Sequence, residues 1–287
     1  MKKTLVIGKR SFLGNHYIKH AKDANRLVLT TDNKDPSDPW FLDLRNPSID
    51  NFPVNEEEID YCIIAAAKTN ISYCERNPTE SYACNVSGPL ELAIQLRKKN
   101  ITPIFFSSDY VFDGIHGEYE EDSPLNPITE YGRQKAELEK LIPEICGKDY
   151  LILRLSKLYG TTKGDKSLLD EMLQLLSENK KIRAAYDQCF CPININDVIR
   201  ILFYLQAYQK RGLYNICGDI PYSRYELAKI VVQKAKSSID EIEKISLEDL
   251  RENFPRPKCT TMSPKKVLQE TNISLTPIEE GIATLLT

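Results

Sequence analysis

The sequence is poor in the features that mark several classes of protein. Positive charge is not in excess, because 38 Lys and Arg residues stand against 41 Asp and Glu, for a net charge of -3. Neutralising nucleic acid phosphates requires a surplus of cations, so nucleic acid is not expected as the main partner. The longest apolar run, Cys62 to Ala67, is far shorter than the roughly 20 residues of a membrane helix, and no membrane association is expected. Lys2 and Lys3 precede only a short apolar stretch, so we expect no secretion signal.

Metal ligands are scarce or poorly spaced. His16 and His20 lie four residues apart on a predicted helix, but His116 is the only other histidine of the chain. The closest pair of the eight cysteines, Cys189 and Cys191, lacks the second pair that a zinc site requires. Most cysteines lie in apolar or strand-like runs, which favours free buried thiols and no metal site. Together with the missing secretion signal, this predicts a reducing cytoplasmic location.

The composition is that of an ordinary globular protein, with 41% hydrophobic and 28% charged residues. The length of 287 residues is close to that of two domains. Through residue 160, short apolar runs alternate with helical patterns, which is typical of a doubly wound parallel sheet in an α/β fold. We predict strands at 4–7, 27–31, 61–66, 102–107 and 150–155, and helices at 12–21, 78–98 and 130–141.

The pattern changes after Gly160. Helices are predicted at 167–178 and 196–206, and a strand at 213–217. A capping box at Ser223–Glu226 and a similar pattern at Thr276–Glu279 predict the starts of two later helices. The charged stretch 235–266 is predicted to be rich in loops.

The strongest local signal is TLVIGKRSFLG at residues 4–14, in which a strand runs into Gly8 and a helix follows Gly14. In a dinucleotide site the first glycine permits a tight turn, and small residues let the backbone approach a pyrophosphate at the helix N-terminus. Ser11 stands where a middle glycine is usual and is small enough to keep that approach. A purely structural turn is the alternative. The pattern predicts a phosphate loop made by Gly8, Lys9, Arg10, Ser11, Phe12, Leu13 and Gly14.

The choice of cofactor rests on a few residues near this loop. Asp32 ends the second predicted strand, where an acid would bind a ribose 2'-hydroxyl and favour NAD. Lys9 and Arg10 would instead neutralise a 2'-phosphate and favour NADP, unless they form only a solvated rim. Asp43 and Leu44 would suit a contact with adenine. NADPH is the favoured prediction, with NADH as the alternative.

A second constellation follows the fourth predicted strand. Ser108 ends that strand, and Tyr131 and Lys135 lie one crossover downstream, on one face of a predicted helix. A nearby ammonium favours the phenolate, so we expect Lys135 to lower the pKa of Tyr131 and to suit it for donating a proton to a forming alkoxide. Ser108 would donate a second hydrogen bond to the same oxygen. The Y-x-x-x-K spacing recurs at Tyr159 and at Tyr225, but neither follows such a strand.

Six motifs stand in the order and spacing of the extended short-chain dehydrogenase/reductases: GKRSFLG, AAAKTN, NVSG, SSDYVFDG, YGRQK and LRLSKLYG. Within that superfamily the chain resembles the dTDP-4-dehydrorhamnose reductase family most narrowly through SSDYVFDG. The likeness continues through YDQ, PININD, GLYNICG and RPK, so it covers nearly the whole chain.

The resemblance implies a Rossmann-type NAD(P)-binding domain at 1–158 and a smaller C-terminal α+β substrate domain at 159–287, with part of 190–215 returning to the first. It implies an NAD(P)H-dependent reductase of a nucleotide-activated 4-keto-6-deoxy sugar, acting in the synthesis of polysaccharide sugars. Its catalytic residues would be Ser108, Tyr131 and Lys135. The last two would also bind the cofactor, together with Ala65, Ala66, Ala67 and Asn85. The substrate would meet Asp109, Tyr110, Lys157 and Arg256.

Three departures from the family pattern bear on substrate and assembly. Lys157 stands where these reductases have a tryptophan, and the run Cys189–Ile193 replaces an expected Gly and Thr around the proline. Acidic residues that would link a dimer through magnesium are not matched, so a homodimer stays an open alternative. Two other functions also stay open: an epimerase or dehydratase of nucleotide sugars, and a non-catalytic regulatory subunit like the methionine adenosyltransferase beta subunit.

Overall fold

The computed structural model describes residues 3–24, 26, 28–31, 33, 36–37, 40–50, 52, 59–250 and 254–287. The chain divides into two compact units. Unit 1 comprises Met1–Val111, Thr129–Leu153 and Leu202–Tyr214, and unit 2 comprises Phe112–Ile128, Arg154–Ile201 and Asn215–Thr287. These units interleave along the sequence, whereas the division after residue 158 stays a prediction about domains.

Unit 1 is built on a six-stranded sheet of order β10-β5-β4-β3-β1-β2. The pairings β1–β2, β1–β3 and β3–β4 are parallel, and Leu5 lies opposite Cys62 and Leu29 in the register. The predicted parallel sheet of an α/β fold is therefore confirmed. The strands are β1 (Thr4–Ile7), β2 (Val28–Thr30), β3 (Tyr61–Ile64), β4 (Thr102–Ser108), β5 (Leu151–Leu155) and β10 (Gly212–Ile216).

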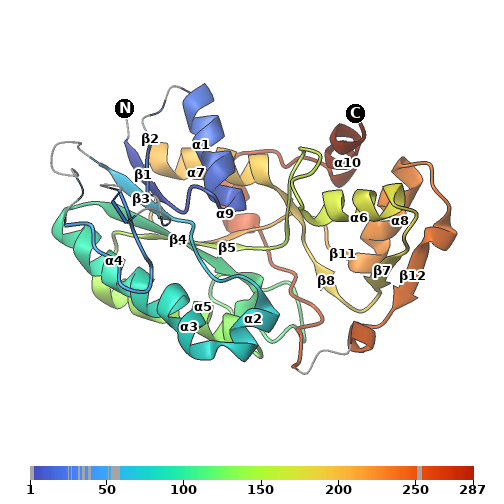
Figure 1. The fold of residues 1–287 in the computed structure, drawn as a ribbon, viewed down its shortest axis with the longest axis horizontal. Helices are drawn as coiled ribbons and strands as arrows, with labels where there is room; N and C mark the ends of the chain where they lie inside the picture. The colour runs from blue at the N-terminus through green and yellow to red at the C-terminus, as the bar shows by residue number, and fades with distance from the viewer. Residues whose placement is uncertain are drawn as a thin grey trace. The chain divides into compact units, whose positions relative to one another are not determined.

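Helices cover both faces of this sheet. Figure 1 shows α1 and α7 on one face, and α4 and α5 on the other. The helix predicted over 78–98 is continuous in space but contains a π-helical turn. Gly88, directly after that turn, lies so close to the Leu44 carbonyl that a Cβ there would collide with it. The helical segments of this unit are α1 (Phe12–Asp23), α2 (Ile71–Arg76), α3 (Pro78–Tyr82), the π turn η1 (Ala83–Ser87), α4 (Gly88–Lys98), the 3-10 turn η2 (Asp109–Val111) and α5 (Glu130–Cys146).

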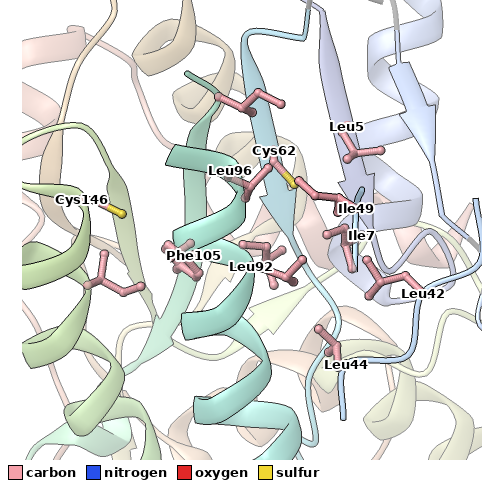
Figure 2. Packing of buried hydrophobic residues seen from close by; sticks show 14 of the residues in the cluster. Leu5, Ile7, Leu42, Leu44, Ile49, Cys62, Leu92, Leu96, Phe105 and Cys146 are labelled. Carbon is pink, nitrogen blue, oxygen red and sulfur yellow. The ribbon is translucent and has the colours of Figure 1, made fainter. Parts of the chain in front are cut away.

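The core of unit 1 lies between the sheet and the helices α4 and α5. Every residue of β1 and β3 is buried, as expected for parallel strands covered on both faces. Leu92 and Leu96 of α4 point toward Cys62 of β3 and Phe105 of β4 (Figure 2). This packing fixes the carboxyl ends of β1, β3 and β4, which is the edge where doubly wound sheets bind ligands.

The late segment 202–214 completes unit 1. Gln206 is fully buried and joins three elements: its Oε1 accepts a hydrogen bond of 3.0 Å from the Tyr17 hydroxyl, its Nε2 donates to Thr4 Oγ1 at 3.2 Å, and its carbonyl accepts from the Tyr61 hydroxyl at 3.0 Å. Phe203 packs edge-on against the Tyr17 ring at 5.3 Å. Residues far along the chain thus tie α1, β1 and β3 together.

Unit 2 consists of short strand pairs and helices. The pairs are β6 with β9, β7 with β12 and β8 with β11. The strands are β6 (Leu158–Tyr159), β7 (Ile182–Ala185), β8 (Cys189–Phe190), β9 (Ile193–Asn194), β11 (Tyr222–Ser223) and β12 (Ile242–Ile245). The helical segments are α6 (Leu168–Ser177), α8 (Arg224–Lys234), η3 (Ile239–Glu241), η4 (Leu247–Leu250), α9 (Lys265–Thr271) and α10 (Ile278–Leu286), while α7 (Ile195–Ala207) runs from unit 2 into unit 1.

One predicted helix cap is confirmed and the other is wrong. Ser223 Oγ accepts from Glu226 N at 3.1 Å and Glu226 Oε2 accepts from Ser223 N at 2.8 Å, so the capping box of α8 is complete. Thr276 does not cap α10, since its N and Oγ1 both donate to the buried carboxylate of Asp197. Thr276 therefore hydrogen-bonds to Asp197, which is distant in the sequence, instead of capping the helix that follows it. Within the described ranges, no helix has both the length and the apolar character needed to cross a bilayer.

Candidate active site

The phosphate loop is shaped by close backbone approach. Gly8 has a φ of +102°, and a Cβ there would lie 2.5 Å from Ala66 N. A Cβ at Gly14 would collide with the Gly8 carbonyl oxygen. Ser11 caps α1, because its Oγ accepts from Gly14 N at 3.0 Å and donates to Gly8 O at 2.8 Å. Ser11 therefore holds the turn together through two side-chain hydrogen bonds, which a glycine at the same position would not form.

A cavity of about 550 Å³ opens beside this loop, within the usual range for a cofactor site. Four of its described lining residues are cationic, namely Lys9, Arg10, Arg45 and Lys68, and two are anionic, namely Asp43 and Glu80. The protein as a whole carries a net charge of -3. Positive charge is therefore concentrated at this cavity, as binding a phosphorylated ligand requires.

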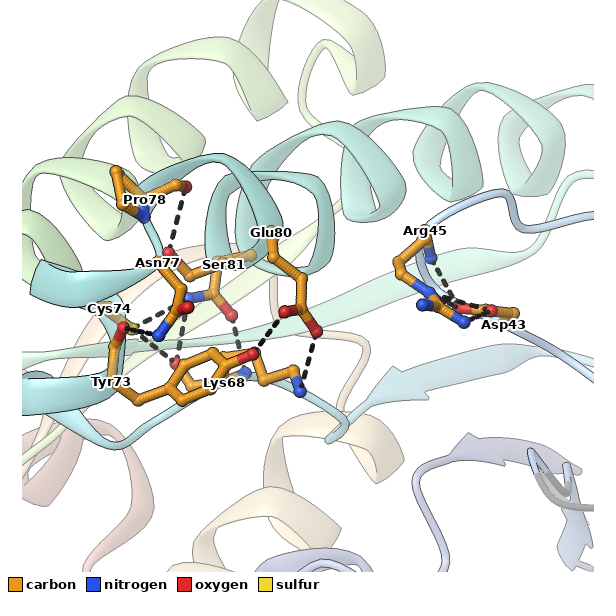
Figure 3. Close-up of polar contacts among 10 residues, drawn as sticks. Asp43, Arg45, Lys68, Tyr73, Cys74, Asn77, Pro78, Glu80 and Ser81 are labelled. Atoms are coloured by element: carbon orange, nitrogen blue, oxygen red, sulfur yellow. Dashed lines mark hydrogen bonds and ion pairs between the residues drawn. The ribbon is translucent and has the colours of Figure 1, made fainter.

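The two carboxylates hold two of those cations in fixed positions (Figure 3). Asp43 accepts two hydrogen bonds of 3.0 Å from Arg45 Nε and one of 2.5 Å from its Nη2. Glu80 binds the Tyr73 hydroxyl and lies 3.3 Å from Lys68 Nζ. The Arg45 hydrogen bonds lower the pKa of Asp43, and the hydrogen bond from Tyr73, followed by that from Lys68, lowers the pKa of Glu80. Both carboxylates thus stay ionised at neutral pH.

Half of the predicted cofactor residues meet at this cavity. Its lining includes Gly8, Lys9, Arg10, Ser11, Asp43, Leu44, Ala66 and Ala67. The lining does not include Phe12, Leu13, Gly14, Ala65, Asn85, Tyr131 or Lys135, and Asp32 lies outside the described residues. The sequence reasoning missed Arg45, Lys68, Glu80 and Cys84. Arg45 and Lys68 directly follow Leu44 and Ala67, which were predicted to bind the cofactor, so their positions in the sequence could have indicated them.

The second constellation is buried at the carboxyl end of β4. Ser108, Tyr131 and Lys135 are each less than a tenth exposed. Ser108 Oγ donates to Asp109 Oδ1 at 3.0 Å, and Lys135 Nζ donates to the Phe106 carbonyl at 2.9 Å. The same ammonium lies 5.8 Å from the centre of the Tyr131 ring. The structure therefore brings the three side chains together in unit 1.

The expected lowering of the pKa of Tyr131 is wrong. Burial raises that pKa well above its ordinary value and the charge of Asp109 raises it further, while a hydrogen bond with Ser108 lowers it in part. Lys135 Nζ is directed to a backbone carbonyl, and burial lowers its own pKa to about 8. Desolvation outweighs charge proximity here. The Tyr131 hydroxyl consequently keeps its proton and is available as a donor.

A buried polar network joins the catalytic helix to the segment after β3. Gln134 lies on α5 between Tyr131 and Lys135, donates to Ser81 Oγ at 2.8 Å and accepts from Asn85 Nδ2 at 2.8 Å. Asn85 in turn accepts from Lys68 N at 2.8 Å and donates to Lys68 O at 2.9 Å. Asn85 thus supports the cavity wall through the backbone of Lys68. Gln134 was missed although it lies within the YGRQK motif.

The predicted substrate residues fall in both units. In unit 1, Asp109 is buried beside Ser108, and the Tyr110 ring centre lies 6.3 Å from that of Tyr131. In unit 2, Lys157 is exposed, and its carbonyl accepts from Ile193 N at 3.0 Å. Arg256 lines a separate cavity of about 290 Å³ with Glu248 and Lys258. No cluster of three or more metal-binding side chains occurs among the described residues.

A glycine-poor phosphate loop on a parallel sheet, followed by a buried Ser, Tyr and Lys group, defines a Rossmann-type protein of the extended short-chain dehydrogenase/reductase superfamily. The fold-class prediction is confirmed. A family model described as the RmlD substrate binding domain matches residues 1–287, so the chain belongs to that family. The resemblance inferred from the motifs is thereby confirmed as well.

Individual relatives align over most of the chain. The spore coat polysaccharide biosynthesis protein SpsK of Bacillus subtilis is 26% identical over 93% of this chain and 91% of its own length. A dTDP-4-dehydrorhamnose reductase of Aggregatibacter actinomycetemcomitans is 27% identical over 94% and 93%. A crystal structure of dTDP-4-dehydrorhamnose reductase from Bacillus anthracis in complex with NADP superimposes with a TM-score of 0.87 at 24% identity, covering 100% and 99% of the two chains. That last likeness shows a shared fold.

Proposed function

We propose that this protein is an NAD(P)H-dependent reductase of a nucleotide-activated 4-keto-6-deoxy sugar, with a dTDP sugar as the first candidate. The observation that carries the proposal is the presence, in one compact unit, of the phosphate loop and of a buried Tyr131 beside Ser108 and Lys135. The family and the names of its relatives support the same chemistry. A cytoplasmic location and a homodimer stay predictions from the sequence.

The cofactor fits the phosphate loop on steric grounds. Close approach of the backbone at Gly8 and Gly14 leaves the N-terminus of α1 open to a pyrophosphate, while Lys9 and Arg10 line the same cavity. A reduced nicotinamide cofactor bound there would supply the hydride. We propose NADPH ahead of NADH, because four lining cations against two carboxylates suit the additional 2'-phosphate.

The protein's own residues would handle the proton and orient the keto group. Tyr131 would donate its hydroxyl proton to the sugar oxygen as negative charge develops there. Ser108 would give the same oxygen a second hydrogen bond, in place of its bond to Asp109. Lys135, held at the Phe106 carbonyl, would stabilise the tyrosinate left behind. A high pKa for Tyr131 suits this direction, because the group begins the reaction protonated.

The test is a panel of dTDP-, UDP-, GDP- and CDP-4-keto-6-deoxy sugars, each with NADPH and with NADH. Absorbance of the reduced nicotinamide and the mass of the sugar product are followed together. One cofactor oxidised for each sugar reduced supports the reductase. Isomerised sugar with no net oxidation identifies an epimerase, whereas loss of water from the parent nucleotide hexose, tested alongside and with no net oxidation, identifies a dehydratase. Cofactor binding without turnover of any sugar favours the regulatory subunit.

A further inference from the structure

Two thiols of unit 2 differ from the remaining cysteines of the chain. All eight cysteines are free, and six of them are buried. Cys189 in β8 and Cys259 are the two that are only half-buried. The sequence pairs Cys189 with Cys191, two residues away, but in the fold its neighbour across the strands is Cys259.

The backbone fixes these two residues opposite each other. Cys189 N donates to Lys258 O at 2.6 Å and Cys189 O accepts from Thr260 N at 2.9 Å, so the two hydrogen bonds flank Cys259 on both sides. Cys259 N donates in the other direction, to Gly114 O at 2.8 Å. Directly opposed residues on neighbouring strands are about 4.8 Å apart. A disulfide requires Cα atoms about 4.4–6.8 Å apart, and the spacing of directly opposed residues falls within this range.

The side chains are consistent with this pairing. Opposed residues of paired strands project from the same face. Cys259 Sγ lies 3.6 Å from Thr261 Oγ1, and burial, followed by the charge of Cys259, raises the pKa of Cys189. The buried thiols nearby are directed elsewhere, since Cys191 Sγ and Cys217 Sγ both donate to the Met262 carbonyl, at 3.8 and 3.2 Å.

We propose that Cys189 and Cys259 form a site of reversible oxidation, which a hydroperoxide converts from two thiols to one disulfide. In the first step a thiolate of the pair attacks a peroxide oxygen, the O–O bond breaks, and a sulfenic acid forms with release of water or an alcohol. In the second step the other thiol attacks the sulfenic sulfur, the S–S bond forms, and the hydroxyl leaves as water. The peroxide accepts two electrons and the two thiols lose two hydrogen atoms. This site is independent of the proposed reductase activity.

The disulfide would clamp a strand that carries charged side chains. Residues 258–260 lie along β8 through two backbone hydrogen bonds, and Lys258 forms ion pairs with Asp187 and Glu248 at 3.2 Å each. A covalent bond at Cys259 would make this attachment permanent under oxidising conditions. Such a crosslink also constrains the unfolded chain, which stabilises the folded state.

The experiment uses the full chain treated with hydrogen peroxide, then alkylated under denaturing conditions and mapped by mass spectrometry without reduction. We expect a peptide pair joined through Cys189 and Cys259 within one chain, which dithiothreitol separates. In Cys259→Ser the linked pair should vanish, while Cys146→Ser, which removes a buried thiol of unit 1, should leave it unchanged.

Three results would overturn the proposal: Cys189 alkylated as a free thiol after treatment, Cys189 joined to Cys191, or Cys189 joined to another copy of the chain. Mapping the unaltered protein is decisive even if a variant does not fold.

Discussion

The phosphate loop and the catalytic helix of unit 1 are built on different principles. The loop depends on the absence of side chains: Gly8 and Gly14 each leave no room for a Cβ against neighbouring backbone. The catalytic helix depends on buried polar side chains, because Tyr131, Gln134 and Lys135 all lie inside the unit and are hydrogen-bonded or charged. The conformation of the loop therefore depends on steric contacts, whereas the properties of the α5 side chains depend on their removal from water.

The difference predicts how each region responds to change. A substitution in the loop acts through geometry and should affect binding of the cofactor. Removal of the Tyr131 hydroxyl on α5 takes away a single functional group, so it should lower turnover far more than cofactor affinity. Four changes test that contrast.

The largest effect is expected for Tyr131→Phe, which removes the proton donor and keeps the ring. General acid catalysis typically contributes about 10²–10⁴-fold, so turnover should fall by that factor while the dissociation constant for NADPH is little changed. Steady-state kinetics and fluorescence titration of the cofactor measure the two quantities. Unchanged turnover would place the acid elsewhere.

Gly14→Ala should have the opposite effect and lower cofactor affinity more than turnover. Its Cβ would collide with the Gly8 carbonyl and lie 2.8 Å from Ser11 Oγ, so the loop would have to move. We expect cofactor affinity to drop on the order of tenfold or more, about 1.4 kcal/mol at least. Gly147→Ala is the control for the added methyl group, because no atom lies within 4 Å of a Cβ there, although Gly147, unlike Gly14, has a positive φ. Equal losses of affinity in both variants would contradict the steric account.

The buried Lys135 should make stability depend on pH. Its folded-state pKa of about 8 lies below the ordinary value of 10.5, so between these values the unfolded chain binds more protons than the folded one. Stability must then rise with pH across that window. Urea denaturation on both sides of pH 8 should show this rise in the unaltered protein and less of it in Lys135→Met. Lys140→Met, at an exposed position of the same helix, should keep the rise.

The smallest effect is expected for Arg10→Gln at the exposed rim of the cofactor cavity. Exposed ion pairs contribute up to about 1 kcal/mol, so NADPH should bind up to about fivefold more weakly while NADH is little affected. The effect should shrink at high salt. Arg183→Gln, at an exposed position of β7, serves as the control. An equal loss for both cofactors would remove Arg10 as a ligand of the 2'-phosphate.

The sequence predicted what depends on neighbours along the chain. The strand, turn and helix around GKRSFLG are local, and α1 begins at Phe12 as predicted. The capping box of α8 is local too. What escaped prediction depends on distant partners: Asp197 takes the hydrogen bonds of Thr276, and Cys189 meets Cys259. The pKa of Tyr131 was misjudged because burial, which spacing along one helix does not reveal, outweighs the charge of Lys135.

The buried Gln206 has a consequence for how the protein is made. The hydrogen bonds that join the hydroxyls of Tyr17 and Tyr61, from the first quarter of the chain, to Gln206 form only after residue 206 has been synthesised. Strand β10, which closes one edge of the unit 1 sheet, follows still later at Gly212–Ile216. A nascent chain that ends before this point lacks β10 at the edge of the sheet and lacks the hydrogen bonds of Gln206. Unit 1 therefore begins to be translated first but is completed late, and until then it exposes the kind of unpaired strand edge that makes a folding intermediate prone to aggregation.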